Sequence, residues 1–473
     1  MSKKRKNIFK DLKVESIGFE GISIARDEGM VYFVKGGVPG DLVKAKLLKK
    51  RKKYTEAIIE EIIEASEDRI EPKCSYFDYC GGCSWQNISY QDQLSWKKRH
   101  VEDAISRIAG IKDIPVHDTF PSSREFHYRN KMDFTFGASR WLFPEEIERQ
   151  DDIANKDFAL GLHVRGRFDK ILDIDFCHIQ PEIGNKILDV VRKKALEMDI
   201  SAYHVFHKEG FLRNLVLRKS LHENSIMLIF VTKKVNEDKE SKYIAEVSQI
   251  LNDEFPEIKS IIHAVNDEIS PVAIGKIDLL YGEEFITEKI LDVEFKISPF
   301  SFFQTNSYQL NPFISKIIEY AELKNDEIVW DLYCGTGSIT LPAAKKCKQI
   351  YGIELVESSI EDAKNNALRN EITNAEFTAS DLHHKDIPEL LGQLPKPDVL
   401  IIDPPRAGMH KNLLSHILEI KPERIVYVSC NPATQARDLA LLDEHYRLIE
   451  VQPFDMFPQT YHIESIAKLE LRK

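Results

Sequence analysis

A cysteine near the C-terminal end of the chain lies where chemistry could occur. The run Ile425-Val-Tyr-Val consists of β-branched and aromatic residues, which is typical of a buried strand. After Cys430 comes the turn pair Asn431-Pro432, where such a strand must end. Ligands of doubly wound α/β sheets lie beyond the carboxyl ends of the strands, so the Cys430 thiol is predicted to face a binding site. Taken alone, a buried cysteine at a strand end is more often an inert packing residue than a nucleophile.

A glycine-rich turn upstream of Cys430 supplies a second part of this site. The motif Asp331-Leu-Tyr-Cys-Gly-Thr-Gly337 follows a short apolar run and precedes a helical pattern. Glycines at such a turn let the backbone approach a ligand closely, so Tyr333, Gly335 and Ser338 are candidate cofactor contacts. The third glycine of the dinucleotide-binding motif is missing. The cofactor therefore need not be a dinucleotide.

Acidic residues end three other predicted strands. Glu354 follows the run Ile350–Ile353, where a carboxylate can accept hydrogen bonds from both hydroxyls of a ribose. Asp381 ends the next strand and is a candidate contact for an adenine amino group. Asp403 begins the run Asp403-Pro-Pro-Arg406, whose prolines stiffen the backbone and remove amide donors. A planar group could pack there while Asp403 accepts hydrogen bonds.

In this order, the glycine turn, the acidic strand end, the Asp-Pro-Pro run and the strand-end cysteine resemble the S-adenosylmethionine-dependent RNA 5-methyluridine methyltransferases. The resemblance covers nearly the whole chain and implies S-adenosyl-L-methionine as cofactor. It implies that Gln304, in Phe300-Ser-Phe-Phe-Gln304, contacts the methionine portion of that cofactor. It also implies a catalytic base at Glu464, in Tyr461-His-Ile-Glu464, where Ile463 replaces the valine of the family.

The resemblance further implies covalent catalysis by Cys430 and Glu464. Carbon 5 of uracil is a poor nucleophile, but addition of a thiolate at carbon 6 creates an enolate with electron density at carbon 5. After methyl transfer, a base must remove the carbon 5 proton so that the thiolate can leave. Cytosine carbon 5 enzymes resemble this chain but carry a second cysteine at the place of Pro405. Uridine is therefore the expected target.

A second group of cysteines has the pattern Cys74-x5-Cys80-Gly-Gly-Cys83, and Cys177 is the best candidate for a fourth ligand. In a reducing compartment such a group indicates a metal site rather than disulfides. Four thiolates suit both zinc and an iron–sulfur cluster. The spacing resembles the segment that carries a [4Fe-4S] cluster in ribosomal-RNA members of the family. The resemblance implies such a cluster here and leaves zinc as the alternative.

The composition is that of a multidomain protein able to bury substantial cores, with 473 residues of which 43% are hydrophobic. Because no apolar run is long enough to span a bilayer and no signal peptide is recognisable, a cytoplasmic protein without membrane contact is expected. The net charge is −11, yet residues 1–55 hold 15 Lys and Arg against six Asp and Glu. An RNA partner would meet this basic end first, although the run Lys3–Lys6 alone fits a solvated tail. No obligate protein partner is predicted.

Residues 1–66 are predicted to form the first domain. Five short runs of alternating apolar and polar residues, separated by turn signals, predict a small β-barrel of the oligonucleotide-binding type. This region looks like a TRAM domain. The basic run Lys49–Lys53 would lie at the tip of a hairpin, where it contacts RNA phosphates or is simply solvated.

Residues 67–300 are predicted to form a strand-rich α+β central domain that contains the cysteine cluster and binds RNA. Its first helix covers Tyr90–Ala109, with Lys97 expected off the apolar face, and two more helices are predicted at Glu182–Glu197 and Lys239–Asn252. The run Tyr128-Arg-Asn-Lys131 could stack on an unpaired base and hold its phosphates. Alternatively its tyrosine is core and its cations are ordinary surface.

Residues 301–473 are predicted to form the methyltransferase domain. Strand and helix patterns alternate through this region, which predicts a doubly wound, Rossmann-like α/β sheet with helices on both faces. Because bacterial transfer-RNA members of the family typically lack the barrel and the cysteine segment, the resemblance implies 23S rRNA as substrate, with an unpaired or flipped uridine. A tRNA substrate and a non-catalytic RNA-binding chaperone are the alternatives. The intact set of site residues argues against the chaperone.

Overall fold

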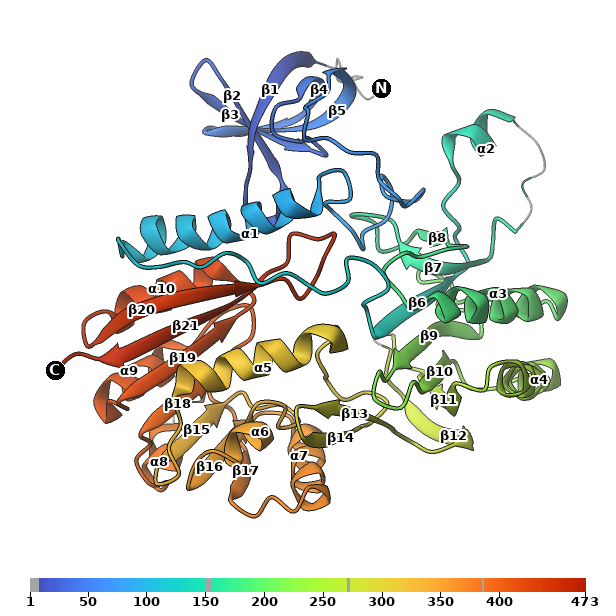
Figure 1. Ribbon diagram of the computed structural model, residues 1–473. Helices are drawn as coiled ribbons and strands as arrows, with labels where there is room; N and C mark the ends of the chain where they lie inside the picture. Colours follow the sequence, from blue (N-terminus) through green and yellow to red (C-terminus); the bar gives the residue numbers. More distant parts are fainter. Residues whose placement is uncertain (1–7, 150–152, 154, 270–272, 385–386) are drawn as a thin grey trace.

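The computed structural model describes residues 8–149, 153, 155–269, 273–384 and 387–473 (Figure 1). The predicted basic tail Lys3–Lys6 lies outside these residues. Along the sequence, the described chain forms a small barrel, a central sheet and a C-terminal sheet. None of the helices in these ranges is long and apolar enough to cross a membrane.

The N-terminal strands close into a five-stranded barrel in the order β1-β2-β3-β5-β4. Leu12 and Val14 fill its interior, while Lys13 between them is exposed, as the pleat of a strand requires. The basic run Lys49–Lys53 spans the turn between β4 and β5, as predicted. The strands are β1 (Phe9–Ile17), β2 (Ser23–Asp27), β3 (Met30–Lys35), β4 (Leu42–Lys50) and β5 (Tyr54–Glu64), with a 3-10 turn at Phe19–Gly21.

The central region is built on a seven-stranded sheet in the order β12-β11-β10-β9-β6-β7-β8. Strand β10 is buried on both faces, so neighbouring residues enter different cores. Leu228 packs with helices α3 and α4, whereas Ile229 packs with the hairpin β13–β14 and the C-terminal region. Both helices predicted after residue 128 are present. The elements are β6 (Lys131–Gly137), α2 (Pro144–Arg149), β7 (Ala159–His163), β8 (Ile171–Asp173), α3 (Glu182–Glu197), β9 (Leu212–Lys219), β10 (Ile226–Thr232), α4 (Asp238–Glu254), β11 (Ile258–Val265), β12 (Lys276–Gly282), β13 (Ile286–Ile290) and β14 (Val293–Ile297).

Helix α1 (Tyr90–Ala104) packs against the C-terminal region, although the sequence predicts it as part of the central domain. Val101, on the apolar side of α1, is buried in the same hydrophobic core as apolar side chains of helix α10 and strand β20. The chain then continues beside β20, where Phe120 pairs with Phe454. Figure 1 shows α1 lying over α10 and β20. A π-helical turn, Ile105–Ala109, ends the helix.

A buried ion pair fixes α1 on the C-terminal region. Lys97 Nζ donates to Asp455 Oδ1 over 2.5 Å and to the Phe457 carbonyl over 3.1 Å. Both charged side chains are fully buried, so the expectation that Lys97 lies off the packed side of α1 is wrong. Its partner is distant in sequence and leaves no trace in helical periodicity. His100 is buried as well, and its Nε2 lies 3.0 Å from the Ile17 carbonyl, which connects α1 to the barrel.

The C-terminal sheet runs in the order β17-β16-β15-β18-β19-β21-β20. The first five strands are parallel, and β21 runs antiparallel to both of its neighbours. Ile401 of β18 packs with α5, α6 and α7, and Leu400 packs with α1, α8, α9 and α10. The predicted doubly wound sheet with helices on both faces is confirmed. The elements are α5 (Ser307–Ala321), β15 (Ile328–Leu332), α6 (Thr340–Ala344), β16 (Gln349–Glu354), α7 (Glu357–Arg369), β17 (Ala375–Ala379), α8 (Ile387–Gly392), β18 (Val399–Ile402), α9 (Lys411–Ile420), β19 (Arg424–Ser429), α10 (Pro432–Leu442), β20 (Tyr446–Phe454) and β21 (Glu464–Leu471).

Candidate active site

A cavity of about 660 Å³ opens at the carboxyl ends of the parallel strands of the C-terminal sheet. This volume lies within the usual range for a small-molecule site. Strand β15 lies between β16 and β18, so the cavity sits at the point where successive connections leave in opposite directions. It is lined by all nine residues predicted for catalysis or cofactor binding: Gln304, Tyr333, Gly335, Ser338, Glu354, Asp381, Asp403, Cys430 and Glu464.

Cys430 lies between the last residue of β19 and the first turn of α10. The Asn431 side chain accepts a hydrogen bond from the Ala433 N–H over 3.1 Å and caps α10, and Pro432 begins the helix without needing an amide donor. Asn431 Nδ2 also donates to the Arg406 carbonyl over 3.1 Å, which ties this turn to the turn after β18. These contacts hold the half-buried Cys430 at the cavity wall.

Two carboxyl groups lie on the strands that flank Cys430. Glu464 begins β21, whose register pairs Ser465 with Ser429, so Glu464 lies beside the end of β19. Asp403 follows β18, the parallel neighbour of β19 on the other side. Burial raises the pKa of both carboxyls, and the Asp403 charge raises the pKa of Glu464 further. The state in which the two carboxyls carry one proton is therefore favoured over the state in which both are ionised.

The surroundings of the Cys430 thiol both oppose and assist its ionisation. Burial, followed by the negative charges of Glu464 and Asp403, raises the pKa of Cys430 to about 11. The Arg406 guanidinium lowers this pKa, as a nearby cation and as a hydrogen-bond donor. Arg406 Nη2 also donates to His462 Nδ1 over 3.0 Å, and burial lowers the pKa of His462 to about 4, so this ring accepts the bond in its neutral form. Arg406 therefore favours the Cys430 thiolate against the larger, opposing effect of burial.

Arg406 and His462 are site residues to which the sequence assigns no role. Arg406 directly follows the Asp-Pro-Pro run, and His462 lies two residues before Glu464. The position of Arg406 directly after the Asp-Pro-Pro run was the available signal in the sequence. The contact between Arg406 and Cys430 depends on the turns after β18 and β19 coming together, and no local sequence pattern indicates this.

The glycine turn and Glu354 form another side of the cavity. The Gly335 N–H donates to Glu354 Oε2 over 3.2 Å, and the N–H groups of Leu355 and Val356 donate to Glu354 Oε1 over 2.8 and 3.0 Å. Gly335 has a φ of +55°, and a Cβ added there would meet nothing within 4 Å, so open space lies directly above the backbone. An open turn beside a fixed carboxylate fits a nucleoside, whose ribose hydroxyls can donate to Glu354.

The remaining cofactor candidates lie around the same cavity. Asp381 is exposed, and its Oδ1 accepts the His383 N–H over 2.8 Å. The buried Tyr333 hydroxyl has no hydrogen-bond partner within the described ranges, which leaves a polar atom for a ligand to satisfy. The Gln304 carbonyl accepts from Asn130 Nδ2 over 2.9 Å, so the central region fixes the backbone of Gln304. This lining fits a polar ligand that extends across several strand ends.

The run that begins at Tyr128 contributes in a different way from base stacking. Tyr128 is 1% exposed and its hydroxyl donates to the Pro458 carbonyl over 3.0 Å, so the stacking hypothesis is wrong and the alternative, a core tyrosine, is correct. Its neighbour Arg129 lines the catalytic cavity. The aromatic side chain that is available there is Phe302, which lines the same cavity and is 67% exposed. The sequence does not indicate that Phe302 is exposed in this cavity, because Phe302 stands in an apolar run.

Four cysteines, Cys74, Cys80, Cys83 and Cys177, line one small, largely apolar cavity of about 20 Å³ in the central region. Burial raises the pKa of all four thiols, to about 11 for Cys80 and about 12 for Cys83. Other thiols of the set raise these two values further. Within the described residues, no three Cys, His, Asp or Glu side chains are arranged to hold a metal ion.

Two family models match the chain. Residues 219–472, more than half of the chain, match the model described as tRNA (Uracil-5-)-methyltransferase. Residues 9–59 match the TRAM domain. The first match contains all nine residues of the catalytic cavity named above, and the second coincides with most of the β1–β5 barrel. The barrel is therefore a TRAM domain.

Relatives match nearly the whole chain. An uncharacterized RNA methyltransferase of Bacteroides thetaiotaomicron is 42% identical over 96% of this chain and 99% of its own length, and one of Chlorobaculum tepidum is 40% identical over 94% and 92%. The structure of the Pyrococcus abyssi tRNA (uracil-54, C5)-methyltransferase in complex with S-adenosyl-L-homocysteine aligns with a TM-score of 0.74 and 29% identity, covering 97% of this chain and 100% of that one. With the site geometry, these matches show that the chain belongs to the S-adenosylmethionine-dependent RNA uracil-5 methyltransferases.

Proposed function

We propose that the protein methylates carbon 5 of a uridine in 23S rRNA through a covalent bond between Cys430 and carbon 6 of the uracil ring. One observation above all supports the covalent mechanism. Cys430 and Glu464 lie at the ends of neighbouring strands, in the same cavity as the glycine turn. The reaction needs a nucleophile and a base beside each other, with the methyl donor within reach of both.

The first step forms the bond between Cys430 Sγ and carbon 6 and moves the electrons of the ring double bond toward carbon 5 and the carbonyl oxygen. This step needs the thiolate. Because the pKa of Cys430 is about 11, only a small fraction of the thiol is ionised near neutral pH. Arg406 supports the step by stabilising the negative sulfur.

The later steps move a methyl group and a proton. S-adenosylmethionine supplies a methyl group on a positively charged sulfur, and its nucleoside is expected to lie along the glycine turn and Glu354. Carbon 5 bonds to the methyl carbon, and the electron pair of the broken methyl–sulfur bond stays on that sulfur. Glu464 then takes the carbon 5 proton, the ring double bond re-forms, and the bond from carbon 6 to Cys430 breaks. Burial raises the pKa of Glu464 and so makes its carboxylate a stronger base.

We further propose that Cys74, Cys80, Cys83 and Cys177 hold a [4Fe-4S] cluster, with zinc as the alternative. The donor set fits a metal group, because four thiols and no carboxylate line their cavity within the described chain. A cluster can bind each cysteine through a different iron atom, whereas zinc needs all four sulfurs around one ion. The Cys74-x5-Cys80-Gly-Gly-Cys83 spacing, which resembles the cluster-bearing segment of ribosomal-RNA members of the family, is the reason for preferring the cluster.

A tRNA is the second candidate substrate. The preference for 23S rRNA rests on the resemblance of the barrel and the cysteine segment to ribosomal-RNA members of the family. However, the tRNA (uracil-54, C5)-methyltransferase of Pyrococcus abyssi aligns over 97% of this chain, so an alignment of this length is compatible with a tRNA enzyme. In either RNA the uridine must leave its stack to reach Cys430.

RNA that contains 5-fluorouridine tests both the chemistry and the substrate, because fluorine at carbon 5 cannot leave as a proton. Folded protein with S-adenosylmethionine is expected to form an adduct that survives denaturing electrophoresis with 5-fluorouridine-substituted 23S rRNA transcripts, and none with tRNA transcripts. An adduct with tRNA alone would replace the substrate. No adduct with either RNA, from protein that still binds the cofactor, would contradict the covalent mechanism.

A further inference from the structure

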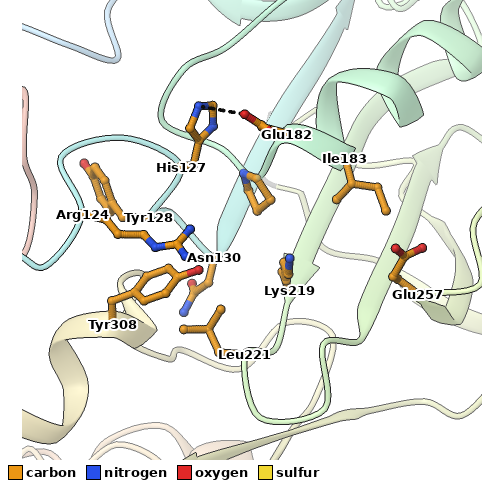
Figure 2. Close-up of a pocket in the computed structure, with 11 residues that line it drawn as sticks. Arg124, His127, Tyr128, Asn130, Glu182, Ile183, Lys219, Leu221, Glu257 and Tyr308 are labelled. Carbon is orange, nitrogen blue, oxygen red and sulfur yellow. Dashed lines mark ion pairs between the residues drawn. The ribbon is translucent and has the colours of Figure 1, made fainter.

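A second cavity, of about 350 Å³, lies where the central sheet meets helix α5 (Figure 2). Its lining includes Arg124, the end of β9 at Lys219 and the first turn of α5 at Tyr308. Figure 2 shows Arg124 next to Tyr308, with Lys219 at the centre of the pocket lining. None of these three side chains lines the catalytic cavity.

A single stretch of chain separates the two cavities. Tyr128 and Asn130 line the second cavity, whereas Arg129 between them lines the catalytic one. Asn130 Nδ2 donates to the Gln304 carbonyl over 2.9 Å and to Ser307 Oγ over 2.7 Å, and Gln304 lines the catalytic cavity. The two cavities therefore lie on either side of one stretch of chain and share a wall.

Two cations enter the second cavity without a direct counter-ion. The Arg124 guanidinium lies 4.3 Å from the centre of the Tyr308 ring. No ion pair joins Arg124 or Lys219 to a carboxylate in the part of the chain that the structure describes. Burial lowers the pKa of Lys219; Glu257 opposes this effect and Arg124 adds to it, so the two cations act on each other.

Two carboxylates line this cavity together with Arg124 and Lys219. Glu182 lies 3.7 Å from His127 Nε2, and its side chain is 75% exposed, so it points largely into solvent. Glu257 is the one other carboxylate in the lining formed by described residues. An anion that enters between Arg124 and Lys219 would meet both positive charges, while Glu257 is the carboxylate that also acts on Lys219.

We infer that this cavity binds a nucleotide of the RNA substrate close to the target uridine, with a phosphate between Arg124 and Lys219 and a base against Tyr308. This inference rests on the proposed function. Arginine forms paired hydrogen bonds to phosphate, and unstacked bases pack on aromatic rings and on guanidinium planes. A volume of about 350 Å³ accommodates one such unit. Holding a neighbouring nucleotide would fix the RNA while the uridine occupies the catalytic cavity.

The double variant Arg124→Gln/Lys219→Gln tests this site in the full-length protein. With the 23S rRNA or tRNA transcript that the wild type methylates, KM is expected to rise about tenfold or more, and the salt dependence of RNA binding to weaken by about one phosphate contact. The kcat and the affinity for S-adenosylmethionine should not change. Lys242→Gln/Arg447→Gln is the matched control, because both cations are exposed and lie outside both cavities, and it should leave KM unchanged.

Two further measurements separate the possible failures. If the wild type methylates neither RNA, the proposed function fails; if it is active and the double variant keeps its KM, only this inference fails. Should inorganic phosphate raise the Tm of the wild type but not of the variant while KM is unchanged, the cavity binds a small anion and the inference is overturned.

Arg124→Gln alone, at an exposed position, replaces the double variant if that one does not fold. A photo-crosslinking residue at Tyr308 should mark a nucleotide near the methylated uridine, and a mark in a distant part of the RNA would also overturn it.

Discussion

Cys430 and the four cysteines of the central region carry the same side chain in different surroundings. Cys430 shares a cavity of about 660 Å³ with Arg406 and four carboxyl side chains, whereas the four cysteines line a cavity of about 20 Å³ whose described lining has no carboxylate. Burial raises the thiol pKa in both places. The Arg406 guanidinium favours the thiolate of Cys430. In the central region, neighbouring thiols raise the pKa of one another, and one metal group could neutralise the negative charges of all four thiolates. The surroundings, rather than the residue type, are thus the basis for proposing a nucleophile at Cys430 and metal ligands in the central region.

Cys430→Ala should have the largest effect on methyl transfer. The rate is expected to fall at least about ten-thousandfold, because the proposed nucleophile is lost and the other cysteine in the described cavity lining, Cys334, is buried in the glycine turn. Radioactive methyl incorporation into RNA measures this loss, and S-adenosylmethionine binding should remain. Cys347→Ala, at a buried cysteine outside both thiol sites, is the control and should keep its activity. Residual activity of Cys430→Ala near that of the control would remove Cys430 from the mechanism.

Glu464→Gln should slow the reaction about a hundred- to ten-thousandfold, because a general base is lost while the nucleophile remains. A covalent protein–RNA complex should therefore accumulate with ordinary uridine RNA, and gel electrophoresis under denaturing conditions detects it. The matched change is Glu470→Gln, on the same strand but in a partly exposed ion pair with Arg447. If the Glu464 variant turned over slowly without any trapped complex, Glu464 would act before bond formation to carbon 6 rather than after it.

Arg406→Gln should cause a severalfold loss that depends on pH. Arg406 lowers the pKa of Cys430, so its removal raises that pKa and leaves less thiolate at any given pH. The rate of iodoacetamide labelling of Cys430 should fall at pH 8, and the rise of this rate with pH should move to higher pH. Labelling at the wild-type rate across the pH range would show that the guanidinium does not control the thiol.

Cys80→Ser should change activity least and the central region most. One of four ligands is lost, so the visible absorption of an anaerobically purified cluster should disappear and the Tm should fall. Binding of S-adenosylmethionine should persist, because the catalytic cavity lies in another part of the molecule. Cys347→Ser controls for the loss of any buried thiol. A colourless wild-type protein that contains zinc would leave the ligand set in place and change its metal.

The strand ends that build the catalytic cavity could be predicted, because each carries its own local signal. Cys430 precedes Asn-Pro, Asp403 precedes Pro-Pro, and Glu354 follows a short apolar run. Parallel pairing then brings these ends to one edge of the sheet, so their convergence follows from the fold class. The four cysteines could be grouped for a similar reason, since three of them stand close together in the sequence.

Contacts between distant segments could not be predicted. Tyr128 is core because the Pro458 carbonyl, 330 residues away, accepts its hydroxyl, and the sequence fits core and stacking equally well. Lys97 is buried because Asp455 is buried opposite to it. The apolar side of α1 predicts that the helix packs, but it does not identify the partner, which proved to be α10.

The contact between the early segment that contains α1 and Phe120 and the late strand β20 has a consequence for how the enzyme is made. On the ribosome, Lys97 and Phe120 emerge long before their partners Asp455 and Phe454. The Lys97 charge of helix α1 therefore stays without this partner until Asp455 has been synthesised. Glu464 emerges later still, so a nascent chain that stalls before it would carry Cys430, the proposed nucleophile, without the proposed base that releases bound RNA.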